Sequence, residues 1–223
     1  MSYDVSHLLP VEGFDPGTSV LIAGPPLTRK RELLLRLLGA PDQGQGTDED
    51  EHEEETGAVQ VTTKTGAGNL LERYRGLNDG NAADRVRVID CVTKERGLGQ
   101  VRETETTRYI SSPRDLTGLS IALSGVLKRL YRDGVRTRIG IHSLSTMLMY
   151  EELSRVFHVL HVLTGQIEST GWIGGFVIDS PTERELDITS QLVDGVIETR
   201  ETDEGCEFRL RGLGGRGAGW QAY

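Results

Sequence analysis

Residues 23–31 contain a glycine and a lysine at the spacing that phosphate-binding loops use. Gly24 and Lys30 match the first glycine and the lysine of the pattern G-x-x-x-x-G-K-S/T. In such loops backbone N–H groups surround the phosphates, the helix N-terminus adds positive potential, and the lysine reaches the terminal phosphates. The spacing therefore predicts a nucleotide-binding loop, with ATP as the expected cofactor. Its members are Gly24, Pro25, Pro26, Leu27, Thr28, Arg29, Lys30 and Arg31.

Two positions of this loop depart from the pattern. Arg29 stands where a second glycine normally allows a tight turn around the phosphates, so a side-chain clash is expected there. Arg31 stands where a hydroxyl normally binds Mg²⁺, and its positive charge repels the metal. We therefore expect nucleotide binding to survive chelation of Mg²⁺. An ordinary strand–helix turn that begins a basic helix is the alternative, and the motif alone does not decide between them.

Such a loop needs a strand before it and a helix after it, and the surrounding sequence predicts both. An apolar run over Ser19–Ala23 indicates a buried strand, and leucines at helical spacing indicate a helix over Thr28–Leu38. The same reasoning predicts strands over Ala58–Thr63, Val86–Cys91, Arg138–His142 and Gly174–Ile178, helices over Asn69–Arg75, Asp115–Tyr131 and Tyr150–Ser169, and a closing strand pair over Leu192–Thr199 and Glu207–Leu210. Alternating strands and helices predict an α/β fold with a mostly parallel sheet, helices on both faces and a C-terminal antiparallel strand pair. Ligands of such sheets bind at the carboxyl ends of the strands.

The length of 223 residues suits one domain, residues 1–223, and the net charge of −9 is concentrated in one segment of it. Residues 42–55 contain eight acidic and no basic side chains, which leaves 26 acidic residues against 25 basic ones elsewhere. We expect a disordered acidic loop over residues 42–56, at the amino ends of the strands, and a mobile excursion over residues 94–110. Nothing in the charge distribution predicts a large basic surface, so nucleic acid is not an expected partner.

The chain carries no signal for a membrane, an export route or a metal. No apolar run reaches the length of a membrane span, and the first ten residues do not resemble a signal peptide. Cys91 and Cys206 are far apart in the sequence and fit a reducing compartment, so we expect a cytoplasmic protein. His158 and His161 lie three residues apart on a predicted helix, but no third ligand is apparent nearby.

Several segments, in order, resemble the KaiC/RadA branch of the RecA-like ATPases. Residues 8–24 resemble the segment that leads into the phosphate-binding loop, Arg138–Ser145 resembles the Walker B strand, Val193–Glu198 resembles the A-D-G-V-I strand, and Arg209–Gly212 resembles the K-x-R-G element. The composition, with many acidic residues and few lysines, resembles that of small haloarchaeal KaiC-like proteins. The resemblance implies a RecA-like P-loop fold. It implies the strand order Val86–Cys91, Ala58–Thr63, Arg138–His142, Gly174–Ile178, Ser19–Ala23, Leu192–Glu198.

The departures from this family affect the groups that would hydrolyse ATP. His142 stands at the position of the Walker B aspartate, and Lys64 and Thr65 stand at the positions of the catalytic carboxylates. The resemblance therefore implies that metal ligation and activation of water are degenerate, because ATP hydrolysis depends on both. Asp90 and Asp179, which follow predicted strands, are the alternative carboxylates, although both also suit strand-end turns.

These observations predict a degenerate KaiC-like protein with little or no ATP hydrolysis. It would be a nucleotide-binding or protein-interaction module with a regulatory or signalling role, and its partner would be another protein, a second copy or a paralogue. The resemblance implies that Arg209 and Arg211 reach the nucleotide of a neighbouring subunit, whereas a surface role without a partner is the alternative. An active or partner-dependent ATPase of the RadA/KaiC type, linked to DNA recombination or repair, is the alternative function.

Overall fold

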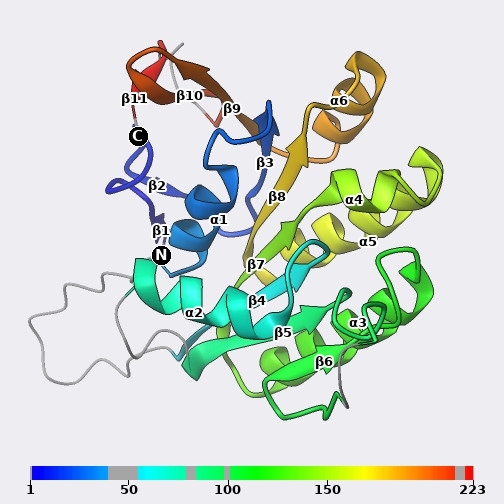
Figure 1. Ribbon diagram of the computed structural model, residues 1–223. Coiled ribbons are helices and arrows are strands. Elements are labelled where there is room, and N and C mark those ends of the chain that lie inside the picture. The colour runs from blue at the N-terminus through cyan, green and yellow to red at the C-terminus, as the bar shows by residue number, and fades with distance from the viewer. Residues whose placement is uncertain (1, 40–54, 79–83, 98–100, 214–218, 223) are drawn as a thin grey trace, which may run out of the picture.

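A nine-stranded sheet forms the centre of the structure, a computed structural model that describes residues 2–39, 55–78, 84–97, 101–213 and 219–222 (Figure 1). Its spatial order is β11-β10-β9-β3-β8-β7-β4-β5-β6. Strands β1 and β2 form a separate antiparallel hairpin. The strands are β1 (Tyr3–Asp4), β2 (Gly13–Phe14), β3 (Ser19–Gly24), β4 (Thr56–Thr62), β5 (Val86–Asp90), β6 (Thr107–Tyr109), β7 (Arg136–His142), β8 (Ile173–Asp179), β9 (Gly195–Thr202), β10 (Gly205–Gly212) and β11 (Gln221–Ala222).

The strand order confirms the order that the resemblance implied. Strand β3, which leads into the phosphate-binding loop, lies inside the sheet between β8 and β9 and is parallel to both. Strands β8, β7, β4 and β5 follow in parallel register on one side. On the other side β9 and β10 form the predicted antiparallel pair. The sheet therefore brings the carboxyl ends of β3, β8, β7 and β4 to one edge, where ligands of parallel sheets bind.

Helices cover both faces of the sheet because alternate strand residues point to opposite sides. The helices are α1 (Lys30–Gly39), α2 (Ala67–Leu77), α3 (Leu116–Arg132), α4 (Leu144–Leu148), α5 (Leu153–Thr170) and α6 (Glu183–Ser190). One core contains Val20 and Ile22 of β3 together with the leucines of α1 and side chains of α2. The other contains Leu21 and Ala23 of β3 together with side chains of α3, α4 and α5. The apolar run of β3 is thus buried on both sides.

The helix ends follow local signals in the sequence. Asp115 caps α3, and its side chain accepts a hydrogen bond of 2.8 Å from the backbone N–H of Gly118. Gly171, with a φ of +70°, ends α5 in the left-handed conformation that glycine adopts readily. Thr182 and Glu185 form a capping box at the start of α6. The short helices α4 and α6 were not among the predicted elements.

The expected excursion over residues 94–110 has to be corrected at its end. Thr107–Tyr109 form the edge strand β6, which pairs in parallel with β5, and Lys94 donates a 2.6 Å hydrogen bond to the carbonyl oxygen of Tyr109. Thr107 packs inward and is buried, which explains why so polar a segment joins the sheet. The predicted acidic loop over residues 42–56 lies outside the described residues except at its end, where Thr56 begins β4.

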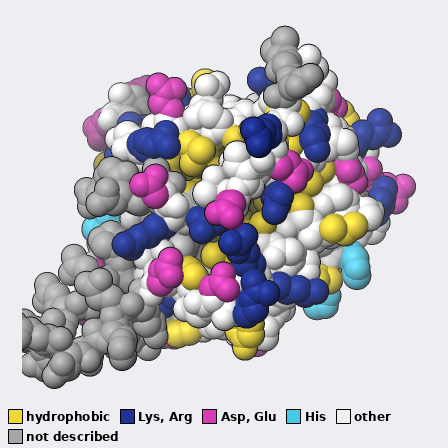
Figure 2. Space-filling view, turned by 90° about the horizontal axis from the view of Figure 1, so that it is seen from below, with side chains coloured by type: hydrophobic (Ala, Val, Ile, Leu, Met, Phe, Trp, Pro, Cys, Tyr) yellow, Lys and Arg dark blue, Asp and Glu magenta, His cyan; other side chains and the backbone are white. Residues whose placement is uncertain are grey.

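Charged side chains of both signs occur together on the face seen in Figure 2. Lys and Arg side chains are interspersed there with Asp and Glu side chains, and no single-sign surface covers this face. Within the described part of the chain, no helix is long and apolar enough to cross a membrane.

Candidate functional site

The loop between β3 and α1 has two strained backbone positions, and its sequence departs from the phosphate-binding motif. Figure 1 shows this loop at the carboxyl end of β3. Leu27 and Arg29 both adopt positive φ, at +68° and +53°, which costs a residue other than glycine about 1–2 kcal/mol. Alternation of right- and left-handed residues can turn backbone N–H groups toward one side and form an anion-binding concavity. Leu27 and Arg29 lie two residues apart, as such alternation requires, but Pro25 and Pro26 supply no backbone N–H.

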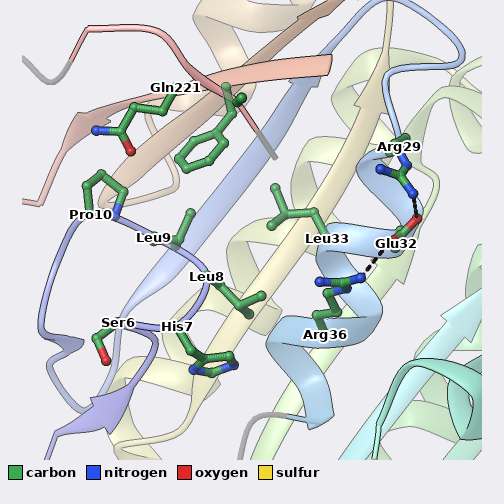
Figure 3. A pocket seen from close by; sticks show the side chains of 12 residues that line it. Ser6, His7, Leu8, Leu9, Pro10, Arg29, Glu32, Leu33, Arg36 and Gln221 are labelled. Atoms are coloured by element: carbon green, nitrogen blue, oxygen red, sulfur yellow. Dashed lines mark hydrogen bonds and ion pairs between the residues drawn. The ribbon is translucent and has the colours of Figure 1, made fainter. Parts of the chain in front are cut away.

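The side chain of Arg29 lies along α1, and its expected clash with phosphates stays a prediction. The side chain of Arg29 turns away from the loop and forms an ion pair of 3.2 Å with Glu32 one turn along α1 (Figure 3). It lines a cavity of about 340 Å³ between α1, the segment after β1 and strand β11. Lys30 and Asp179 do not line this cavity. The cavity in Figure 3 is therefore separate from the place where Lys30 meets Asp179.

Lys30 points into the loop and is almost fully buried. Its side chain is 3 % exposed, and its Nζ donates to the carbonyl oxygen of Pro25 and to Thr28 Oγ1 at 3.0 Å. Thr28 Oγ1 lies 2.6 Å from Thr199 Oγ1 on β9, which fixes the loop against the neighbouring strand. Burial lowers the pKa of Lys30, and Asp179 partly offsets that effect. The ammonium group is therefore held in one position at the carboxyl end of β3 by Pro25, Thr28 and Asp179.

Asp179 contacts both lysines, although the sequence favoured a strand-end turn for it. It ends β8, opposite Gly24 in the register, and its Oδ1 lies 3.0 Å from Lys30 Nζ. Its Oδ2 accepts a hydrogen bond from Lys64, which follows β4. Burial opposes ionisation of Asp179, but the hydrogen bonds from Lys64 and Lys30 outweigh it and hold the pKa below its ordinary value. One carboxylate thus bridges two ammonium groups.

His142 lies between these residues at the end of β7. It is 7 % exposed, and its Nδ1 has no hydrogen-bond partner among the described residues. Burial, followed by the positive charge of Lys64, lowers its pKa to about 4, so the imidazole is neutral at pH 7. The charges of Asp179, Arg31 and Lys30 also act on His142, which places it within the same cluster. A neutral imidazole cannot reproduce the negative charge of the aspartate that the resemblance expects there.

Thr65 and Asp90 serve local structure. The hydroxyl of Thr62 donates to the carbonyl oxygen of Thr65 at 2.7 Å and so closes the turn that carries Lys64. Asp90 is fully buried and accepts hydrogen bonds from the backbone N–H groups of Ala67, Val92 and Thr93 and from the hydroxyl of Thr93. The turn interpretation of Asp90 is therefore confirmed, whereas Asp179 joins the lysines.

Arg209 and Arg211 have a partner within the chain. Both donate to Glu198 on the adjacent strand β9, Arg211 at 2.8 Å, and these contacts lower the pKa of Glu198 despite its burial. Arg209 and Arg200 also lie over the ring of Trp220, with centroid distances of 4.8 Å and 4.1 Å. The structure does not bring these arginines into the Lys30 cluster, and their predicted contact with a neighbouring subunit stays a prediction.

The side chains at the site are cationic around a single carboxylate. Lys30 and Lys64 both contact a single carboxylate, that of Asp179, so these three groups carry a net positive charge. Mg²⁺ requires oxygen ligands, usually carboxylates, and the two ammonium groups would repel it. Among the described residues, no group of three or more His, Cys, Asp and Glu side chains could hold a metal. Phosphate oxygens match the cationic donors and the loop amides.

The strained loop leads to a prediction at Arg29. The free energy of unfolding of Arg29→Gly should be about 1 kcal/mol higher than that of Arg29→Ala, because only glycine adopts the positive φ without strain. Urea denaturation of the two variants measures this difference. Arg36 is the matched control, because it also pairs with Glu32 but lies within α1. At position 36 the free energy of unfolding of the alanine variant should be about 1 kcal/mol higher than that of the glycine variant. The same order at both positions would contradict the loop conformation.

A family model matches residues 17–199 of this chain, and its description reads "Family of unknown function (DUF7504)". The match contains the loop, Lys64, His142, Asp179 and Thr199. No curated protein matches the chain.

Two solved structures from Pyrococcus horikoshii share this fold. One is the uncharacterized protein PH0321, solved in complex with an unknown peptide, with a TM-score of 0.63 and 12 % identity over 91 % of this chain and 86 % of that one. The other is the KaiC-like protein PH0186 from strain OT3, with a TM-score of 0.60 and 15 % identity over 97 % of this chain and 88 % of that one. These likenesses show a KaiC-like, RecA-type fold for the chain.

Proposed function

The chain belongs to the DUF7504 family, and from its site we propose that it is a KaiC-like protein that binds a nucleotide through its phosphates and hydrolyses it little or not at all. The single observation that carries this proposal is Lys30, buried beneath a loop whose residues Leu27 and Arg29 hold positive φ. A buried lysine in a strained loop at the carboxyl end of a central strand is costly for stability, and phosphate recognition is the function that this arrangement supports. Binding without turnover suits a regulatory or signalling protein.

Weak hydrolysis follows from the groups at the site. Lys64 and His142 stand where the resemblance expects carboxylates. The Lys64 ammonium cannot accept a proton from water, and the neutral His142 lacks the negative charge that would order a Mg²⁺ shell. We expect ATP turnover at background level, far below the ordinary range of about one per second or faster. A partner subunit or a paralogue that supplies catalytic residues would raise turnover only in the mixed complex.

Replacing Lys30 tests the proposal. Lys30→Met keeps the apolar part of the side chain and should weaken ATP binding by about 10- to 100-fold, because charge-assisted hydrogen bonds contribute about 1.5–3 kcal/mol. Isothermal titration of ATP at high salt measures the affinity. Lys128→Met, on the exposed side of α3, is the matched control and should bind as the unchanged protein does. Equal affinity in the Lys30 variant would show that the phosphate site is elsewhere.

A protein-interaction module is the second candidate function. The structural neighbour PH0321 was solved with an unknown peptide, so one protein of this fold binds a peptide. Leu27, at the tip of the loop, is 86 % exposed and offers an apolar contact to a partner. An absence of any ATP binding in the titration above would favour this candidate.

A further inference from the structure

Two ammonium groups and one carboxylate form the centre of the proposed phosphate site. Lys30 comes from the start of α1, Lys64 from the turn after β4, and Asp179 from the end of β8. Strand β7 separates β4 from β8, so Lys64 reaches across the end of β7 to contact Asp179. The two lysines therefore converge on the two oxygens of a single side chain.

We propose that this site binds a pyrophosphate group without a divalent cation, that Lys64 supplies the positive charge in place of the metal, and that Asp179 occupies both lysines until the ligand displaces it. The inference rests on the proposed function and names its ligand chemistry. A carboxylate presents two oxygens on one carbon, and a phosphate presents oxygens on one phosphorus with greater negative charge. The anion can therefore bridge the same two ammonium groups and compete successfully with Asp179.

The charge of the cluster supports an anion and opposes a metal. Lys30 and Lys64 together carry two positive charges against the single negative charge of Asp179. A second anion would bring the cluster close to neutrality, whereas a divalent cation would add charge of the sign already in excess. Lys64 is 41 % exposed and can follow a ligand, whereas Lys30 is 3 % exposed and fixed.

His142 is a second, independent observation that points to a ligand at this site. Its side chain is more than nine-tenths buried, and its Nδ1 has no hydrogen-bond partner among the described residues. Buried polar atoms are normally paired, and an unpaired one needs a structural or functional reason. In the neutral imidazole Nδ1 can carry the proton, and it would then donate to a phosphate oxygen held between Lys30 and Lys64.

Removing the competing carboxylate gives the sharpest test. Asp179→Asn keeps the shape of the side chain and should bind ATP about tenfold more tightly, because the ligand no longer displaces a charged group from the lysines. Lys64→Met should bind about tenfold more weakly. Both affinities, and that of the unchanged protein, should be the same in excess EDTA and in excess Mg²⁺. Asp187→Asn, on the exposed side of α6, is the matched control for the charge change.

The opposite results would overturn the inference. If Asp179→Asn weakens binding, or if EDTA abolishes binding by the unchanged protein, Asp179 acts with a metal and Lys64 does not replace it. If Asp179→Asn does not fold, Lys64→Met and the EDTA titration decide the question. Binding that requires Lys30 and also requires Mg²⁺ would leave the proposed function standing while this inference fails. An ATP affinity that does not depend on Lys30 would contradict both the proposed function and this inference.

Inorganic pyrophosphate identifies the group that is recognised. It should compete with ATP in the unchanged protein, and its affinity should change in Asp179→Asn and Lys64→Met in the same direction as that of ATP. Tighter binding of ATP than of pyrophosphate would identify the ligand as a nucleotide, and equal binding would identify it as the free anion. Failure of pyrophosphate to compete at millimolar concentration would contradict the inference.

Discussion

Gly24→Ala should lower the free energy of unfolding by about 3–5 kcal/mol. A Cβ at this position would lie 2.3 Å from both the carbonyl oxygen and Oγ1 of Thr199, and the φ of Gly24 is +155°, which L side chains rarely adopt. Strand β3 cannot move aside, because β8 and β9 hold it on both edges. The close approach and the backbone conformation therefore destabilise the variant together. Urea denaturation measures the change.

Gly125→Ala is the control for this substitution. Gly125 lies on the exposed side of α3, and a Cβ there would have no atom within 4 Å. Alanine favours the helix by about 0.5–1 kcal/mol, so this variant should be more stable than the unchanged protein. A cost below about 1 kcal/mol for Gly24→Ala would show that β3 and β9 are not as close as the structure places them.

Much of the fold was predictable because the central strands are long, apolar and separated by strong helices. The run over Ser19–Ala23 is bounded by glycines and buried on both faces. Its continuous apolar sequence therefore indicates a strand whatever packs against it. Strands of two or three residues, such as β1, β6 and β11, are too short to show a recognisable hydrophobic pattern. Thr107–Tyr109 joins the sheet through its pairing with β5. This pairing is a tertiary contact, so the local sequence of the segment does not indicate it.

The site was harder to predict because its central contacts are distant in the sequence. The loop residues were found from their spacing, but Lys64 and Asp179 are 115 positions apart, and nothing local relates them. A signal for Asp179 did exist. The predicted order put Gly174–Ile178 beside Ser19–Ala23, and the residue that ends one parallel strand must lie beside the residue that ends its neighbour. The backbone shape at Arg29 could not be inferred, because residues other than glycine rarely adopt positive φ.

Acidification should destabilise the protein through His142. The folded pKa of about 4 is below the unfolded value of about 6.5, so the unfolded chain binds more protons between these values. The contribution of His142 to the free energy of unfolding is therefore fully present above pH 6.5 and is lost as the pH falls to about 4. Below pH 4 this group causes no further loss. The loss amounts to about 3 kcal/mol, since one pKa unit corresponds to 1.36 kcal/mol.

His142→Gln isolates this contribution, because it removes the titrating group and keeps a polar side chain. Urea denaturation of both proteins from pH 7 to pH 4 gives two profiles, and every other histidine and carboxylate is common to both. The profile of the unchanged protein should fall by about 3 kcal/mol more than that of the variant. Parallel profiles would show that His142 is solvated in the folded protein. A steeper fall confirms that β7 ends in a buried neutral imidazole, whose unpaired Nδ1 is then free to meet a ligand.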